Sequence, residues 1–178
     1  MEPTLEHLKY PVGPWTWPET VSESEIAEGI QIIEAFPDKV ARAISGFTNA
    51  QLDTPYRPGG WTIRQLVHHL ADSHMNAYVR FKLALTEDNP VIKPYDQDKW
   101  ASLADSLDDP DVSMNILTGM HRRWVNIMND MSPSDWDRPL RHPEHSIPLN
   151  LRKLVAQYRW HCEHHLQHIL RLRQREGF

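Results

Sequence analysis

The chain has 178 residues, of which 40% are hydrophobic and 24% are charged, which is enough apolar material for a packed core and too little charge for a disordered protein. A formal net charge of −5 argues against a protein whose main role is to bind nucleic acid. No apolar run approaches the roughly 18 residues of a membrane span, and no secretory signal is recognisable at the N-terminus. The single cysteine, Cys162, excludes an intrachain disulfide, which is typical of the reducing cytoplasm, so we expect a cytoplasmic protein. Because no apolar run is long enough to span a bilayer, we expect no membrane partner.

Residues 1–20 contain four prolines together with Tyr10, Trp15 and Trp17. Because proline fixes φ and removes a backbone donor, this composition predicts an extended arm packed on the surface rather than a helix. No glycine- or serine-rich linker and no change of composition separates the arm from the rest of the chain. We therefore expect one domain over residues 1–178.

A first amphipathic helix is expected from Ser22 to Ile44. Ser22 and Glu25 form a capping-box pattern at its start. Pro37 lies inside the run and predicts a kink or a break. The apolar positions that recur on one face are Ile26, Ile30, Ile33, Val40 and Ile44.

A second helix is expected from Thr62, which forms another capping box with Gln65. Its apolar stripe comprises Ile63, Leu66, Val67, Leu70, Ala77, Phe81 and Leu85. A long loop with three prolines follows over about 87–110.

A third helix is expected over about 111–131, and residues 132–149, which hold four prolines, are expected to form a loop with a short helical turn. Asn150 caps a fourth helix over about 151–175, and Gly177 marks its end. The third helix should bury Val112, Ile116, Leu117, Met120, Trp124, Ile127 and Met131. The fourth should bury Leu151, Leu154, Val155, Tyr158, Ile169 and Leu172.

Four amphipathic helices, none of which can bury its apolar face alone, predict an all-α fold, a four-helix bundle. No segment alternates with period two for long enough to predict a strand. The two long connections favour at least one crossover over a simple array of hairpins.

Histidines are concentrated in two short windows, 68–74 and 161–168. A catalytic zinc site needs three protein ligands and an open position, and imidazole is a common ligand. Two histidines at i and i+4 on one helix lie about 40° apart around the axis and about 6 Å apart along it, so both can reach one ion. The third ligand must then come from another helix.

The fourth helix offers two i, i+4 pairs. On a helical projection His165 lies within about 20° of the centre of the apolar stripe and His161 about 60° from it, whereas His164 points about 120° away. The inward pair is therefore His161 and His165, and the pair of His164 and His168 is disfavoured.

The second helix leaves three candidates open. The projection places His74 nearest the apolar centre, His69 about 110° from it and His68 about 150° from it. A lone histidine in an apolar stripe is more often a hydrogen-bonded core residue than a ligand. An inward pair and a second cluster on another helix strengthen the metal hypothesis, because buried imidazoles without partners are costly.

Other kinds of active site find little support, since the sequence lacks the His-Glu-x-x-His, Cys-x-x-Cys and Gly-x-Ser-x-Gly motifs. Cys162 projects inward and is expected to be a buried structural thiol. Asp72 and Glu163 project outward, so no general base is assigned. Arg64 and Arg80 could bind an anionic substrate, but their long side chains favour a role on the helix surface.

Two segments together resemble the DinB/YfiT-like superfamily. Residues 59–76, GGWTIRQLVHHLADSHMN, are similar to its second helix, and residues 160–165 are similar to its C-terminal His-x-x-x-His motif. Residues 10–13 and 80–83 also resemble the YfiT branch, so the likeness extends over essentially the whole chain.

The resemblance implies a four-helix bundle with up-down-down-up topology. In the family pattern the ligand on the second helix lies eight residues after a tryptophan and directly before a leucine, which corresponds to His69. The other two ligands correspond to His161 and His165, the pair that the projection also selects. The family further implies one divalent ion per subunit, zinc or nickel, and a homodimer.

The activity that the resemblance implies is metal-dependent hydrolysis of a small-molecule substrate. A metal bound by three neutral imidazoles lowers the pKa of a ligand in its open position, which can be water. It can equally be a low-molecular-weight thiol, and some members of the superfamily transfer a thiol such as bacillithiol to an electrophile. A stress-related protein that binds a metal or a thiol without turnover is a third hypothesis.

Overall fold

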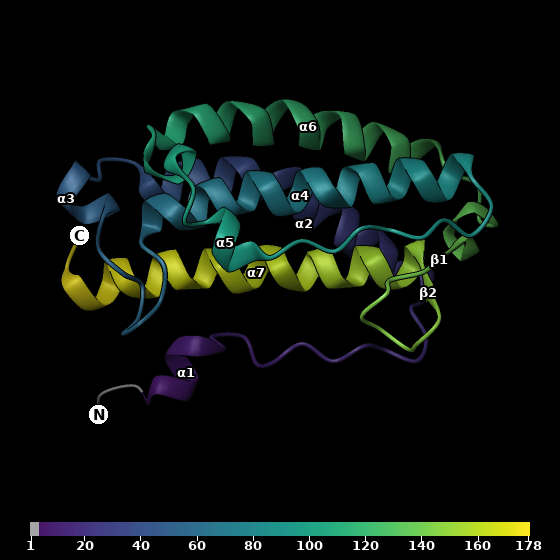
Figure 1. Cartoon of the computed structure of the whole chain (residues 1–178), viewed down its shortest axis with the longest axis horizontal. Coiled ribbons are helices and arrows are strands. Elements are labelled where there is room, and N and C mark those ends of the chain that lie inside the picture. Colours follow the sequence, from purple (N-terminus) through teal and green to yellow (C-terminus); the bar gives the residue numbers. More distant parts are fainter. Residues whose placement is uncertain (1–3) are drawn as a thin grey trace.

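Four long helices lie side by side in the computed structural model, which describes residues 4–178 (Figure 1). They are α2 (Glu23–Ile44), α4 (Ile63–Thr86), α6 (Pro110–Asp130) and α7 (Leu151–Glu176). Helices α2 and α7 run in one direction along the bundle, and α4 and α6 run in the other (Figure 1). The predicted four-helix bundle with up-down-down-up topology is confirmed.

Three of the long helices begin where the predicted caps lie. Backbone N–H groups and side chains exchange hydrogen bonds between Ser22 and Glu25, and between Thr62 and Gln65, so both capping boxes are formed. The Asn150 side chain accepts from the backbone N–H of Lys153 at 3.0 Å. These caps fix the starts of α2, α4 and α7.

The parallel pair of α4 and α6 requires a connection that returns along the bundle. This crossover contains the short helix α5 (Gln97–Trp100) and the 3-10 helix η1 (Ala104–Leu107), and η1 packs on α4. It covers Arg64, which was expected on the surface but is buried. The Arg64 guanidinium pairs with Asp53 at 2.7 Å and donates to the carbonyl oxygen of Asp108, so its role is structural.

Proline-rich residues 132–149 form the expected connection between α6 and α7. It holds the 3-10 helix η2 (Asp135–Asp137) and two short antiparallel strands, β1 (Pro139–Leu140) and β2 (Leu149–Asn150). Each strand has two residues, too few to produce a recognisable alternation in the sequence.

The N-terminal arm is only partly extended. Residues 1–3 lie outside the described part of the chain. A short helix, α1 (Leu5–Lys9), follows with Thr4 as its N-cap, so the expectation of an arm without helix is wrong there. After α1 the chain runs in extended form along α7 (Figure 1), and Trp160 Nε1 donates to the carbonyl oxygen of Gly13 at 3.1 Å. A further short helix, α3 (Asn49–Leu52), links α2 to α4.

Pro37 was expected to kink or to break the first helix, and α2 continues through it without a break. Proline removes one N–H donor, which leaves the carbonyl oxygen of Ile33 without its helical partner. That oxygen instead lies 2.6 Å from Nδ1 of His121 on α6. A hydrogen bond between helices therefore replaces the one that Pro37 removes.

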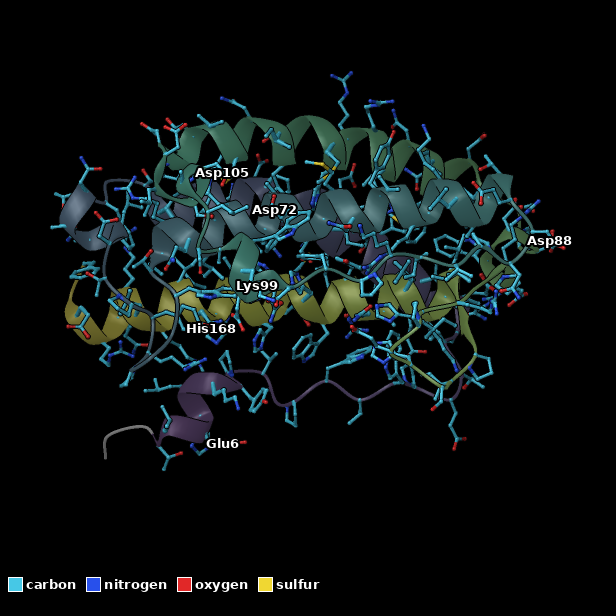
Figure 2. All side chains as sticks on the ribbon, in the orientation of Figure 1. Glu6, Asp72, Asp88, Lys99, Asp105 and His168 are labelled. Carbon is cyan, nitrogen blue, oxygen red and sulfur yellow. The ribbon has the colours of Figure 1, made fainter. Side chains whose placement is uncertain are left out.

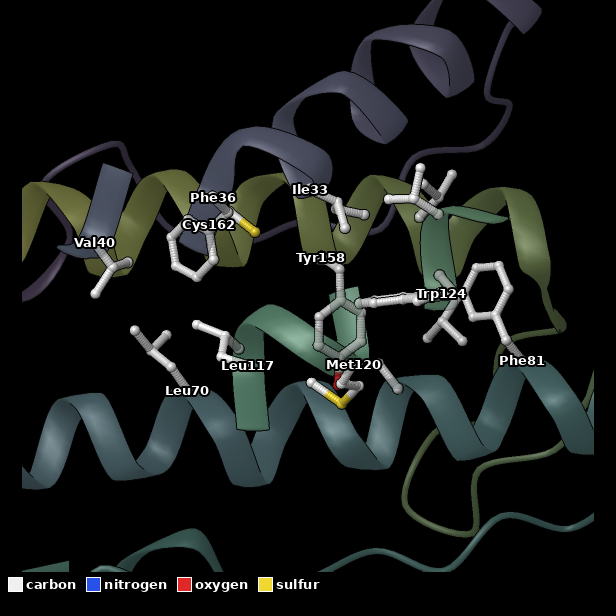
Figure 3. Packing of buried hydrophobic residues seen from close by; sticks show 14 of the residues in the cluster. Ile33, Phe36, Val40, Leu70, Phe81, Leu117, Met120, Trp124, Tyr158 and Cys162 are labelled. Atoms are coloured by element: carbon white, nitrogen blue, oxygen red, sulfur yellow. The ribbon is translucent and has the colours of Figure 1, made fainter. Parts of the chain in front are cut away.

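The core lies between all four helices, and Trp124, Tyr158 and Phe36 fill its centre (Figure 3). The stripes predicted for α4 and α7 are buried or half-buried. On α6 the prediction is wrong for Val112 and Ile116, which are 49% and 43% exposed. The buried face of α6 instead includes polar residues, Ser113 and His121, and apolar periodicity cannot identify them.

Within residues 4–178 no helix combines the length and the apolar character that a bilayer span requires.

Leu70 provides a test of the core because it is fully buried between α4 and its neighbours (Figure 3). We expect Leu70→Ala to lower the free energy of unfolding by about 2–5 kcal/mol, because it removes buried apolar atoms and leaves a cavity. The matched variant Leu170→Ala, at a position that is 39% exposed, should change it by less than about 0.5 kcal/mol. Urea unfolding of both variants measures the difference, and equal effects would contradict the packing.

Candidate metal centre

Helices α4 and α7 bring together three histidines that lie far apart in the sequence. One ligand atom from each of His69, His161 and His165 lies within 4.8 Å of the others. The Nε2 atoms of His69 and His161 are 3.3 Å apart. His161 and His165 are one turn apart on α7, and His69 faces them from α4, so the arrangement is that expected for three ligands of one ion.

Burial keeps these imidazoles neutral. Removal from water lowers the pKa of His69 to about 3 and places the pKa of His161 and of His165 well below the ordinary value of 6.5. A neutral imidazole has an unprotonated nitrogen, which is the form that binds a metal. The donor set therefore fits a divalent ion that prefers nitrogen ligands.

A cavity of about 500 Å³ opens onto two of these histidines, His161 and His165. Trp61 covers His69, with the two ring centroids 4.6 Å apart. The other side chains around the cavity are mainly aromatic or charged: Lys9, Tyr10, Tyr56, Arg57, Gln97, Asp98, Gln157, Trp160 and His164. A second cavity of about 590 Å³ lies at the loop between β1 and β2 and is lined by none of the three histidines.

His164, His165 and His168 form a second group of close nitrogen atoms. The projection placed His164 outward, but its side chain is only 7% exposed because the N-terminal arm covers this face of α7. The labelled His168 faces the same arm in Figure 2, and its Nε2 lies 3.4 Å from the carbonyl oxygen of Lys9. This second group shares His165 with the group of His69, His161 and His165. Desolvation and then the charge of Arg57 lower the pKa of His164 to about 4, and this nearby cation also disfavours a metal ion.

The two other candidates on α4 have partners of their own. His68 lies with Nδ1 2.7 Å from Oγ of Ser113 and with Nε2 3.1 Å from the carbonyl oxygen of Asp108. His74 is a fully buried core residue, and its Nε2 lies 3.0 Å from Nδ1 of His161. Neither joins a three-ligand group among the described residues. Of the three alternatives, the geometry therefore favours His69.

The acidic and thiol groups considered from the sequence lie outside the cavity wall. Asp72 is half-buried rather than solvated, and burial together with the nearby Asp105 raises its pKa (Figure 2). Cys162 is buried as expected, and burial raises the pKa of its thiol, which makes it a poor nucleophile. The carboxylate that does line the cavity belongs to Asp98, which α5 positions and which the sequence pattern did not indicate.

Comparison with known proteins relates this arrangement to a family. The sequence profile of the DinB superfamily matches residues 32–169. Over 171 residues the chain is 49% identical to a protein of Bacillus mycoides (strain KBAB4) and 47% identical to one of Bacillus cereus (strain 03BB102), both named "Putative metal-dependent hydrolase"; each match covers 96% of this chain and 98% of the relative.

A solved structure is also similar. YfiT from Bacillus subtilis, described as "a probable metal-dependent hydrolase with an unusual four-helix bundle topology", matches with a TM-score of 0.93 and 43% sequence identity. The match covers 97% of this chain and 99% of that chain, so the likeness includes the crossover and the arm as well as the four helices.

The lowered pKa values predict how stability depends on pH. The pKa of His69 is lowered to about 3 and that of His121 to about 4, mainly by burial, and unfolding restores values near 6.5. Below pH 6.5 the unfolded chain therefore binds more protons than the folded chain. The free energy of unfolding should be fully retained above pH 6.5 and should fall as the pH drops toward 4, by up to about 1.4 kcal/mol per pH unit for each such histidine.

Urea unfolding of EDTA-treated protein at a series of pH values measures this dependence. The interval from pH 6.5 to about 5 is the most informative, because ordinary carboxylates titrate mainly below it. A free energy of unfolding that stays constant across this interval would contradict neutral burial of the histidines.

Proposed function

The chain belongs to the DinB superfamily, and on that basis we propose that it is a metal-dependent hydrolase whose divalent ion is bound by His69, His161 and His165. The observation that carries the proposal is the convergence of three neutral imidazoles from two helices beside a cavity. The names of the relatives support the same class of activity. We propose zinc or nickel as the ion, since both accept imidazole ligands.

A bound divalent ion would supply Lewis acidity and would activate water for attack on a polarised substrate bond. The protein's own contribution begins with shape, because a cavity of about 500 Å³ accepts a small molecule. Tyr10 and Trp160 in the cavity wall offer apolar contacts to a substrate, and the Arg57 guanidinium offers a site for an anionic part. Asp98 contributes the carboxylate in the cavity wall and is our candidate for the group that accepts a proton.

The N-terminal arm completes the enclosure of the site. Tyr10 lines the cavity, and the arm is held to α7 by the Trp160–Gly13 hydrogen bond. Water is thereby excluded from one side of the histidine cluster, which strengthens electrostatic interactions with a bound substrate. The homodimer and the cytoplasmic location expected from the sequence stay predictions.

Metal binding tests the ligand set directly. We expect wild-type protein to bind one equivalent of Zn²⁺ or Ni²⁺. His165→Ala should lose the metal, because only two ligands remain, and should keep its helical circular dichroism. The matched control is His145→Ala, at an exposed position, which should bind as wild type does. Elemental analysis and calorimetric titration measure the stoichiometry. Unchanged metal content in His165→Ala would exclude the site.

Activity tests the reaction class. We expect metal-loaded protein to hydrolyse members of a panel of small esters and amides, and EDTA or His165→Ala to reduce the rate at least about 100-fold, because the Lewis acid is lost. A parallel assay supplies a low-molecular-weight thiol and the electrophile monochlorobimane.

The outcomes separate the hypotheses. Metal-dependent hydrolysis without thiol consumption supports the proposal. Metal-dependent thiol consumption without hydrolysis would replace it with thiol transfer, and no turnover in either assay would favour a binding protein.

A further inference from the structure

A chain of buried hydrogen bonds connects the backbone of α2 to a proposed metal ligand on α7. The carbonyl oxygen of Ile33 lies 2.6 Å from Nδ1 of His121, and Nε2 of His121 lies 2.8 Å from Nδ1 of His74. Nε2 of His74 in turn lies 3.0 Å from Nδ1 of His161. All four helices take part, since these groups belong to α2, α6, α4 and α7.

The first acceptor in this series of hydrogen bonds, the carbonyl oxygen of Ile33, lacks its helical donor because of Pro37. In a regular helix the N–H of residue 37 would donate to the carbonyl oxygen of Ile33, but proline has no N–H. A carbonyl oxygen can only accept, so Nδ1 of His121 must be the donor.

This single constraint determines the direction of every later bond. A neutral imidazole has one N–H, so Nε2 of His121 must accept, and Nδ1 of His74 must donate to it. By the same reasoning Nε2 of His74 accepts from Nδ1 of His161. His161 is then left with an unprotonated Nε2, the atom that lies 3.3 Å from Nε2 of His69.

The surroundings hold the two intermediate rings in place. His74 and His121 are 0% and 1% exposed. Phe36 stacks on both, with ring centroids 5.3 Å and 5.9 Å away, and Trp124 meets both edge-on. Burial also disfavours protonation of either ring, which would break the donor–acceptor order.

We propose that Pro37, His121 and His74 form a tautomer relay, a chain of hydrogen bonds that fixes His161 as its Nδ1–H tautomer and so directs its Nε2 to the metal. His74 and His121 are positioning residues in this account, because they act through His161. The value of the relay for metal binding rests on the proposed function, whereas the tautomers themselves exist in the metal-free protein.

Nitrogen NMR of histidine-labelled, EDTA-treated protein tests the relay without any metal. Long-range proton–nitrogen correlations identify which ring nitrogen carries hydrogen, and we expect Nδ1–H for His121, His74 and His161. Signals are assigned with single substitutions. Detection of His161 as the Nε2–H tautomer would overturn the relay even if metal binds, and absence of metal binding would overturn only the proposed function.

Substitutions of His121 separate positioning from packing. His121→Leu removes both the donor and the acceptor, so we expect loss of the single tautomer at His161 and a rise of about 10- to 100-fold in the dissociation constant for Zn²⁺. His121→Gln can still donate through its NH₂ and accept through its carbonyl oxygen, so it should restore both readouts. Rescue of stability by Gln without rescue of the His161 tautomer would contradict the relay.

The matched control is His68→Leu, since His68 is also buried and hydrogen-bonded on α4 but lies outside the relay. It should lower stability while leaving the tautomer of His161 unchanged. A loss of the His161 tautomer in this control would mean that any buried histidine has the same effect, and would contradict the proposal.

Pro37→Ala gives a test that does not depend on a destabilised variant. Alanine is a far better helix former than proline, and its N–H competes with His121 for the carbonyl oxygen of Ile33. We expect a protein at least as stable as wild type in which the His161 tautomer is less uniform and Zn²⁺ binds more weakly. An unchanged tautomer and an unchanged dissociation constant would show that Pro37 does not set the relay.

Discussion

Removal of imidazole rings from water is the constraint on which the rest of this structure depends. The facing sides of α4 and α7 carry histidines where most bundles carry only apolar residues, and burial lowers the pKa of each. Charged rings at these positions would repel one another and would be poorly solvated. The four helices can therefore pack together only if these imidazoles are neutral. A neutral imidazole can bind a metal through its unprotonated nitrogen, and it can donate one hydrogen bond and accept another.

The same constraint explains why the accessory segments pack as they do. Asp108 in the crossover supplies a backbone partner for His68, and Ser113 in the first turn of α6 supplies a side-chain partner. The N-terminal arm covers the other side of α7, where Tyr10 packs against His164. Each segment satisfies or shields histidines that a bare four-helix bundle would leave at its surface, and together they leave one cavity at the proposed metal centre.

The proline in α2 illustrates how an apparent defect serves the site. Loss of one backbone N–H at Pro37 leaves the Ile33 carbonyl oxygen free, and His121 binds it from another helix. Buried carbonyl groups are rarely left without a donor. In a helix without proline at this position, the N–H of residue 37 would compete with His121 for the Ile33 carbonyl oxygen. Nδ1 of His121 would then no longer be required to donate, and the direction of the later hydrogen bonds would not be determined.

The sequence by itself determined the four helices, their caps and the inward pair His161 and His165, because 3.6-residue periodicity and capping boxes are local properties of the chain. It left the partner on the second helix open on periodicity alone, with only family resemblance favouring His69. It also placed His164 and Arg64 outward, and on α6 it placed Val112 and Ile116 in the core and missed the buried Ser113 and His121. Tertiary structure decided these points, because burial there depends on the arm, on the crossover and on polar contacts of Ser113 and His121, none of which leaves a periodic signal. Convergence of α4 on α7 is likewise a property of packed helices, since no pattern within either helix specifies the distance between them.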